Sequence, residues 1–112
     1  MKPRALLSTL LLLLVECRNY EGRLEVENVA SVAIDRITIN VCGQAIRLEG
    51  IAPSTSALAS YRVSADGHYD VWVEFRGGST LQGSLGYVTT GMNFSDHLLV
   101  SDSEIRLERA IK

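Results

Sequence analysis

Apolar and polar residues alternate along most of the chain after its N-terminal stretch. Leu24 and Val26 fall on one side of the first alternating segment, and Glu25 and Glu27 fall on the other. A two-residue period is typical of a β-strand with one buried face. No segment keeps the 3.6-residue period of an amphipathic helix. Turn residues interrupt the alternation about every 8–12 residues, which is the strand spacing of an all-β domain.

The alternation predicts about eight short strands. We expect them at residues 23–28, 32–41, 44–49, 58–63, 68–76, 80–88, 94–100 and 104–111. In the second of these, the phase slips between Ile34 and Ile37, which predicts a β-bulge around Asp35. The later residues expected to face the core are Ala59, Tyr61, Val63, Tyr69, Val71, Val73, Phe75, Leu81, Leu85 and Tyr87. Strands that each bury one face favour a single antiparallel β-sandwich.

Two local motifs refine this fold prediction. Gly77-Gly78 is typical of a hairpin turn. Gly67-x-Tyr69-x-Val71 resembles the tyrosine corner of immunoglobulin-like domains, in which a tyrosine near the start of a strand bonds to upstream backbone. The chain lacks the Cys-Trp-Cys core of antibody domains, so the resemblance implies a disulfide-free, fibronectin-III-like sandwich. Residues 86–94, with the earlier segment from Asn28 to Val41, resemble small exported bacterial β-sandwich proteins of uncharacterised function, and no functional residues transfer from them.

The N-terminal stretch has the pattern of a secretory signal. A basic start, Met1-Lys2-Pro3-Arg4, precedes a leucine-rich run from residue 5 to 15. The run is shorter than the roughly 20 apolar residues that a spanning helix needs. A short basic segment followed by a short apolar one is instead typical of a cleaved signal peptide.

The end of this stretch, Leu14-Val15-Glu16-Cys17, resembles the cleavage box of bacterial lipoprotein precursors. The resemblance implies a signal peptide at 1–16, a lipid on Cys17 and a β-sandwich domain at 17–112. Arg18, rather than Asp, after the cysteine implies a periplasm-facing protein anchored to the outer membrane. Glu16 stands where such precursors have a small residue, so ordinary signal-peptidase cleavage nearby and an uncleaved anchor stay open.

Charge and cysteine content exclude some partners. The chain has 11 Lys and Arg against 13 Asp and Glu, a formal net charge of −2, and no basic cluster. We therefore expect no nucleic-acid partner. If Cys17 carries lipid, Cys42 is a lone thiol, and such thiols are usually buried and inert. A Cys17–Cys42 disulfide is the alternative if Cys17 is not acylated.

Trp72 is the candidate binding residue. Alternation in its strand places it on the outer face with Asp70, Glu74 and Arg76. A tryptophan among charged residues on an outer face can anchor a protein interface. The alternatives are that Trp72 lies flat over a neighbouring strand, that Arg76 stacks on it, or that the last hairpin covers it.

Metal and catalytic signals are weak. Asp66, His68 and Asp70 lie close together in the sequence, and imidazole and carboxylate groups suit zinc and similar ions. They need further ligands, which Asp96-His97 could supply only if the fold brings the two segments together. The chain has no nucleophile elbow, His-Glu-x-x-His motif or phosphate-binding glycine loop. We therefore expect no cofactor and no enzymatic activity.

These observations favour a non-catalytic, envelope-anchored β-sandwich that binds another envelope protein through the face of Trp72, Asp70, Glu74 and Arg76. One alternative is an inhibitor or immunity protein for an envelope hydrolase. The other is a small metal-binding protein or metal-dependent enzyme that uses His68 and His97.

Overall fold

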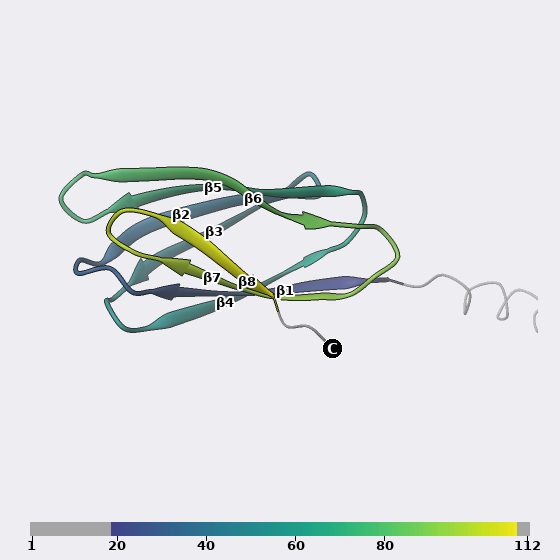
Figure 1. Ribbon diagram of the computed structural model, residues 1–112, viewed down its shortest axis with the longest axis horizontal. Helices are drawn as coiled ribbons and strands as arrows, with labels where there is room; N and C mark the ends of the chain where they lie inside the picture. Colours follow the sequence, from purple (N-terminus) through teal and green to yellow (C-terminus); the bar gives the residue numbers. More distant parts are fainter. Residues whose placement is uncertain (1–18, 110–112) are drawn as a thin grey trace, which may run out of the picture.

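Residues 19–109 are described by the computed structural model, and they form two four-stranded β-sheets packed face to face (Figure 1). The strands are β1 (Glu21–Asn28), β2 (Ile34–Val41), β3 (Gln44–Ile51), β4 (Ser56–Arg62), β5 (Gly67–Phe75), β6 (Thr80–Val88), β7 (Phe94–Val100) and β8 (Ile105–Arg109). The predicted all-β sandwich of eight strands is confirmed. Within the described part, no helix has the length and apolar character needed to cross a membrane.

The two sheets differ in how their strands pair. Sheet A has the order β4-β1-β7-β8, and sheet B has the order β3-β2-β5-β6. Sheet B is antiparallel throughout. In sheet A, β1 and β7 are parallel, with Gly22 opposite Phe94 and Asn28 opposite Val100. The prediction of a fully antiparallel sandwich is therefore wrong at this pair.

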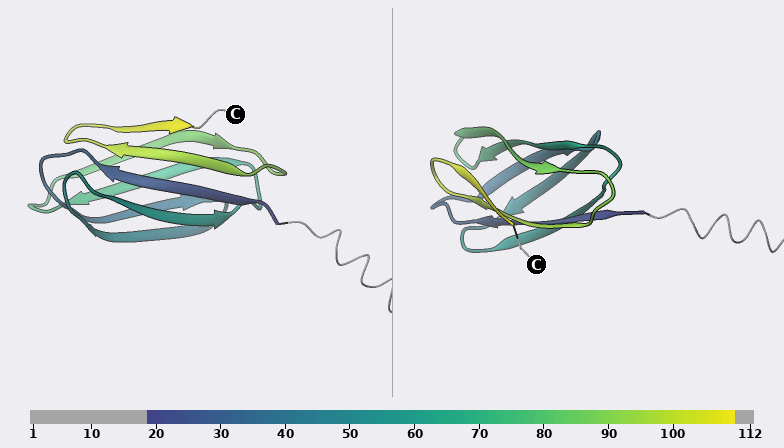
Figure 2. Two further views of the ribbon diagram at one scale, coloured as in Figure 1. Left: turned by 90° about the horizontal axis from the view of Figure 1, so that it is seen from below. Right: turned by 45° about the vertical axis from the view of Figure 1, so that its right-hand side comes forward.

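The parallel pair follows from the path of the chain. Each connection turns the chain back along the sandwich, so the odd-numbered strands run in one direction and the even-numbered strands in the other (Figures 1 and 2). Every other neighbouring pair joins an odd strand to an even strand and is antiparallel. Only β1 and β7 are both odd. Alternation along each strand does not reveal which strands will be neighbours, so the sequence pattern missed this pair.

The inward faces of both sheets form one apolar core. The fully buried side chains in it include Leu24, Val26, Ile34, Ile37, Ile39, Tyr69, Val73, Val88, Leu98 and Val100. The pairing of β2 with β5 shifts register between Ile34 and Arg36. The β-bulge predicted around Asp35 is therefore confirmed, and it keeps Ile34 and Ile37 both in the core.

One core prediction is wrong. Tyr87 was expected to face the core, but its side chain is 58% exposed and the next residue, Val88, is buried. The pairing of β5 with β6 shifts register between Gly67 and Tyr69. Gly86, at φ 73°, lies in this irregular segment. An extra residue in one strand reverses the alternation beyond it, so the inward phase moves from Tyr87 to Val88.

Gly22 leaves space for the Tyr61 ring in the core, because it has no side chain. The two residues are opposite each other on β1 and β4. Gly22 is buried, and a Cβ atom added to it would overlap the Tyr61 ring. The ring is itself 4% exposed and its hydroxyl is hydrogen-bonded, so it has little room to move away.

We predict that Gly22→Ala lowers the free energy of unfolding by about 1–3 kcal/mol, because the added methyl group overpacks this site. Gly67→Ala is the matched control, since nothing lies within 4 Å of a Cβ atom built there. Urea denaturation of the two variants and the parent chain measures both effects. Equal midpoints for all three proteins would show that Tyr61 can shift without cost.

Candidate functional site

Trp72 lies at the centre of the outer face of sheet B. Its strand, β5, has β2 on one side and β6 on the other. Tyr69, Val71 and Val73 point into the core, so alternation directs Trp72 outward, where its side chain is 42% exposed. Its nearest cross-strand neighbours are Thr38 and Gln82. The structure thus places Trp72 on the outer face, as the sequence predicted.

A row of ion pairs flanks Trp72 toward the β5–β6 turn. Arg36 lies across from Glu74, with their nearest charged atoms 3.8 Å apart, and 3.5 Å from Glu49 on its other side. Arg76 lies just beyond β5, with its Nε 3.3 Å from an oxygen of Asp35. All these side chains are well exposed, so each pair adds at most about 1 kcal/mol to stability.

Arg76 does not cover Trp72. The cation–π contact found within the described chain is Arg109 over the Phe94 ring, 4.7 Å from its centre. The alternative in which Arg76 stacks on Trp72 is therefore not what the structure shows. The indole is left as an exposed aromatic surface at the middle of the sheet.

Asp70 is held in place on the other side of Trp72. Its Oδ1 accepts a hydrogen bond of 2.5 Å from the Ser84 hydroxyl and lies 3.0 Å from His68 Nε2. The Ser84 hydrogen bond, with a further contribution from His68, lowers the pKa of Asp70 below its ordinary value. The carboxylate is therefore ionised and oriented before any partner arrives.

These residues surround a shallow open depression of about 460 Å³ on sheet B. Its outward side chains are Thr38, Asn40, Asp70, Trp72, Gln82 and Ser84. We call this surface the Trp72 face. Of the four binding residues predicted from the sequence, Trp72 and Asp70 border the depression, whereas Glu74 and Arg76 lie in the ion pairs beside it.

The structure does not assemble the metal site considered from the sequence. Asp66 accepts a hydrogen bond from the backbone N–H of Thr90. His68 is on the outer face of sheet B, whereas His97 is on the outer face of sheet A, 2.8 Å from Glu27. Among residues 19–109, no three His, Cys, Asp or Glu side chains converge as metal ligands would. The thickness of the sandwich separates the two histidines.

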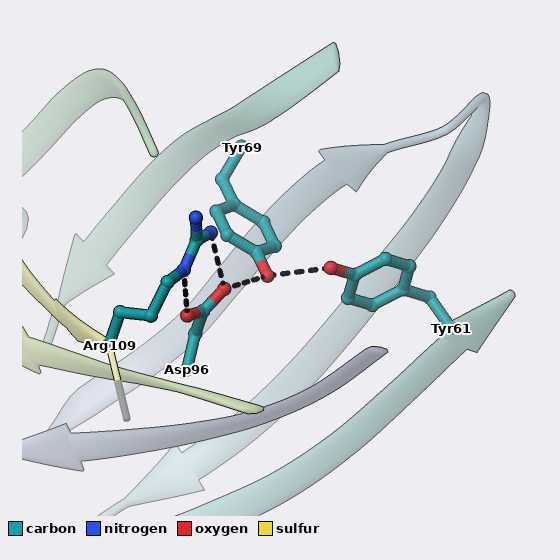
Figure 3. Close-up of polar contacts among 4 residues, drawn as sticks. All are labelled: Tyr61, Tyr69, Asp96 and Arg109. Carbon is teal, nitrogen blue, oxygen red and sulfur yellow. Dashed lines mark hydrogen bonds and ion pairs between the residues drawn. The ribbon is translucent and has the colours of Figure 1, made fainter. Parts of the chain in front are cut away.

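A buried polar chain crosses between the sheets near the end where β1 begins (Figure 3). Asp96, with no exposed side-chain surface, accepts two hydrogen bonds from Arg109, of 2.7 and 3.0 Å. Tyr69 donates a 2.6 Å hydrogen bond to Asp96. Because the Tyr69 proton is used there, Tyr61 donates to the Tyr69 oxygen, also over 2.6 Å. We call these four residues the cross-sheet clamp, since Tyr69 belongs to sheet B and the others to sheet A.

The electrostatics of the clamp keep each group in its bonding form. Burial raises the pKa of the Tyr69 hydroxyl, and its hydrogen bond to Asp96 raises it further. Burial also raises the pKa of Tyr61, while the hydrogen bond to Asp96 raises that of Arg109. Both tyrosines therefore stay neutral donors beside a charged arginine. Each polar group satisfies another, which suits a structural role.

The clamp corrects two expectations. Tyr69 was expected to bond to upstream backbone, as in a tyrosine corner, but its hydroxyl donates to the Asp96 carboxylate instead. Asp96 was considered as a metal ligand, but its side chain points into the core from β7 and the residue is 4% exposed. The alternation Phe94, Asp96, Leu98, Val100 could have shown that this carboxylate faces the core. A buried carboxylate needs a partner, and Arg109 was available in the next strand.

The structure describes one of the two cysteines, Cys42. Cys17 lies outside the described residues, so the lipidation and disulfide predictions for it remain predictions. Within residues 19–109, Cys42 has no disulfide partner; its thiol is half-buried, and its Sγ lies 3.2 Å from the Ala65 carbonyl oxygen.

Comparisons with known proteins bear on the fold. No protein family and no curated protein matches this sequence. Among solved structures, the chain is similar to the NMR structure of a protein from Eubacterium rectale, at a TM-score of 0.55 and 11% sequence identity. The similarity covers 84% of this chain and 90% of the other. At this identity the match supports a small β-sandwich and carries no activity.

We predict that Tyr69→Phe lowers the free energy of unfolding by about 1–3 kcal/mol, because Asp96 and Tyr61 each lose a buried hydrogen-bond partner. Tyr87→Phe is the matched control, since the Tyr87 side chain is 58% exposed. Urea denaturation followed by circular dichroism measures both. If Tyr69→Phe is no less stable than Tyr87→Phe, the clamp does not stabilise the fold.

Proposed function

We propose that this protein is a non-catalytic binding domain of the bacterial cell envelope and that the Trp72 face is its contact surface. The observation that carries the proposal is the 42% exposure of Trp72 at the centre of a sheet. A central strand is hydrogen-bonded on both sides, so the indole is presented by a rigid platform. Tryptophan is enriched among the residues that contribute most to binding. The partner expected from the sequence is another envelope protein.

The disposition of reactive groups supports a binding role. The buried carboxylate, Asp96, is engaged by Arg109 and Tyr69 within the clamp. The two histidines lie on opposite faces, and His97 is beside Glu27. Catalysis by covalent attack requires a nucleophile, a base and a group that orients the base to converge at one place.

The envelope location rests on the N-terminal sequence. Cys17 precedes the start of β1 at Glu21 by four residues, which span at most about 14 Å when extended. A lipid on Cys17 would therefore hold the domain close to the membrane surface. An immunoglobulin-like topology belongs to this proposal as well, and the two packed four-stranded sheets support it. The tyrosine-corner motif does not, because the Tyr69 hydroxyl bonds to Asp96 and not to backbone.

We predict that Trp72→Ala abolishes capture of a partner from solubilised envelopes, because the main apolar contact of the face is lost. Leu58→Ala is the matched control, since Leu58 is a 76% exposed apolar residue on the outer face of sheet A. Tagged versions of the parent chain and both variants are used as bait, and captured components are identified by mass spectrometry and glycan analysis.

The thermal midpoint of each bait is measured in parallel. Since Trp72 is an outward but partly covered side chain on a central strand, we expect its replacement to lower stability by about 1 kcal/mol, which leaves the domain folded. A partner kept by Leu58→Ala and lost from a folded Trp72→Ala supports the proposal. A partner retained equally by all three baits assigns the contact to another surface and overturns it.

We predict that Cys17→Ser moves the protein from the membrane fraction to the soluble fraction, because lipid can no longer be attached. Cys42→Ser is the matched control, since Cys42 lies within the folded domain. Cell fractionation and the mass of the mature protein measure anchoring and cleavage. A parent chain that is already soluble, or a Cys17→Ser variant that stays in the membrane, contradicts lipid anchoring.

A further inference from the structure

The arrangement of side chains on the Trp72 face defines a small, flat polar platform. Register places Trp72 between Thr38 and Gln82, and the neighbouring row has Asp70 between Asn40 and Ser84. Strands lie about 4.8 Å apart, and outward residues repeat about every 6.6 Å along each strand. The two rows therefore cover an area on the order of 10 Å by 7 Å. A hexose ring and its hydroxyl groups fit such an area.

The chemistry of the platform matches that of a sugar. One face of a pyranose ring presents C–H groups, which pack flat against an aromatic ring such as the Trp72 indole. Its rim presents hydroxyl groups, which both donate and accept hydrogen bonds. Around the indole, Asn40 and Gln82 offer amide groups and Thr38 offers a hydroxyl, so donors and acceptors are both available.

Asp70 has a carboxylate oxygen available to accept a hydrogen bond from such a ligand. Its bonds to Ser84 and His68 both end on Oδ1. Within the described chain, Oδ2 therefore has no hydrogen-bonded partner and can accept from a ligand hydroxyl. Hydrogen bonds to an ionised acceptor are roughly twice as strong as those between neutral groups. Because Asp70 is oriented in advance, little conformational freedom is lost on binding.

The charge of the Trp72 face favours a neutral carbohydrate over an acidic one. Asp70 borders the depression, and Glu74 lies beside it with the guanidinium group of Arg36 already shared between Glu74 and Glu49. Arg47 lies in the same row as Trp72, beyond Thr38, and is not among the residues that line the depression. Asp70 is the one charged side chain in that lining, so its ionised carboxylate would repel an acidic glycan seated there but not a neutral one.

The same features fit a protein partner less well. Specific protein interfaces bury about 800 Å² on each partner, and their centres are enriched in several aromatic and apolar residues. On the outer face of sheet B, two large aromatic side chains are strongly exposed: Trp72 at the centre, and Tyr87 near the end of β6, where its neighbour Val88 pairs with Gly67. Tyr87 is not among the residues that line the depression, so Trp72 is the one aromatic ring there. One aromatic ring surrounded by small polar groups is enough for a sugar ring.

We infer that the Trp72 face binds an uncharged carbohydrate chain, with one sugar ring stacked on Trp72 and its hydroxyl groups bonded to Asp70, Gln82 and Asn40. This inference rests on the proposed function, because it names the class of ligand for the same face. It requires no catalytic step, since the ligand is bound and not altered.

Intrinsic fluorescence tests the inference, because Trp72 is the single tryptophan of the chain. The full mature domain is titrated with soluble oligomers of N-acetylglucosamine and of glucose, and with an oligouronate as the acidic probe. We expect a saturable change in Trp72 emission with a neutral oligomer and none with the acidic one. Calorimetry then compares the variants: Trp72→Ala and Gln82→Ala each weaken binding at least about tenfold, whereas Leu58→Ala binds as the parent chain does.

The outcomes separate this inference from the proposed function. Saturable binding of a neutral oligomer that is lost in a folded Trp72→Ala variant supports both. If the envelope capture experiment yields a protein through Trp72 while no neutral oligomer binds, the proposed function stands and the carbohydrate inference is overturned. Binding of the acidic oligomer alone also overturns it. If neither experiment depends on Trp72, both fail.

Discussion

Asp96 carries a negative charge inside the sandwich. Side chains from three other strands, β4, β5 and β8, form the hydrogen-bonded chain that stabilises this charge. Arg109 on β8 supplies two hydrogen bonds, and Tyr69 on β5 supplies a third from the opposite sheet. Removing one partner from a buried charge is far more costly than the net contribution of an ordinary hydrogen bond. The sheets must therefore meet in one relative position at this end, whereas the apolar contacts elsewhere in the core would tolerate small shifts. Gly22 and Gly86 leave the space that the two tyrosine rings need.

The position of the clamp also determines what the outer surface presents. Tyr69 and Trp72 lie on the same strand and, at this spacing, on opposite faces. Fixing the Tyr69 hydroxyl against Asp96 therefore fixes the rotation of β5 and directs Trp72 outward. Neighbouring strands on both sides hold the backbone of β5 by hydrogen bonds. A site built on such a strand keeps its geometry better than one built on a loop, and this rigidity is what a shallow binding surface without an enclosing pocket requires.

Local alternation was sufficient to predict the strands, their number, the bulge at Asp35 and the outward direction of Trp72. It failed where a feature depends on segments far apart in the sequence. The irregular β5–β6 pairing reversed the phase at Tyr87. The parallel β1–β7 pair and the Tyr69–Asp96 bond depend on which strands become neighbours, and hydrophobic patterning does not encode that choice directly. For the candidate site, the sequence indicated Trp72 and Asp70, but the contributions of Asn40, Gln82 and Ser84 required the register of three strands.

The central place of β1 in sheet A has a consequence for the order in which the molecule can form. Sheet B consists of two hairpins, β2–β3 and β5–β6, joined by the β2–β5 pair, so it can form from a continuous middle section of the chain. β1 is synthesised first, yet its partner β7 arrives near the end, and Arg109 arrives later still. Contacts over such long separations form slowly because the intervening chain must first be closed into a loop. Sheet A can therefore be completed, and the sandwich closed over the core, only after the last two strands have become available.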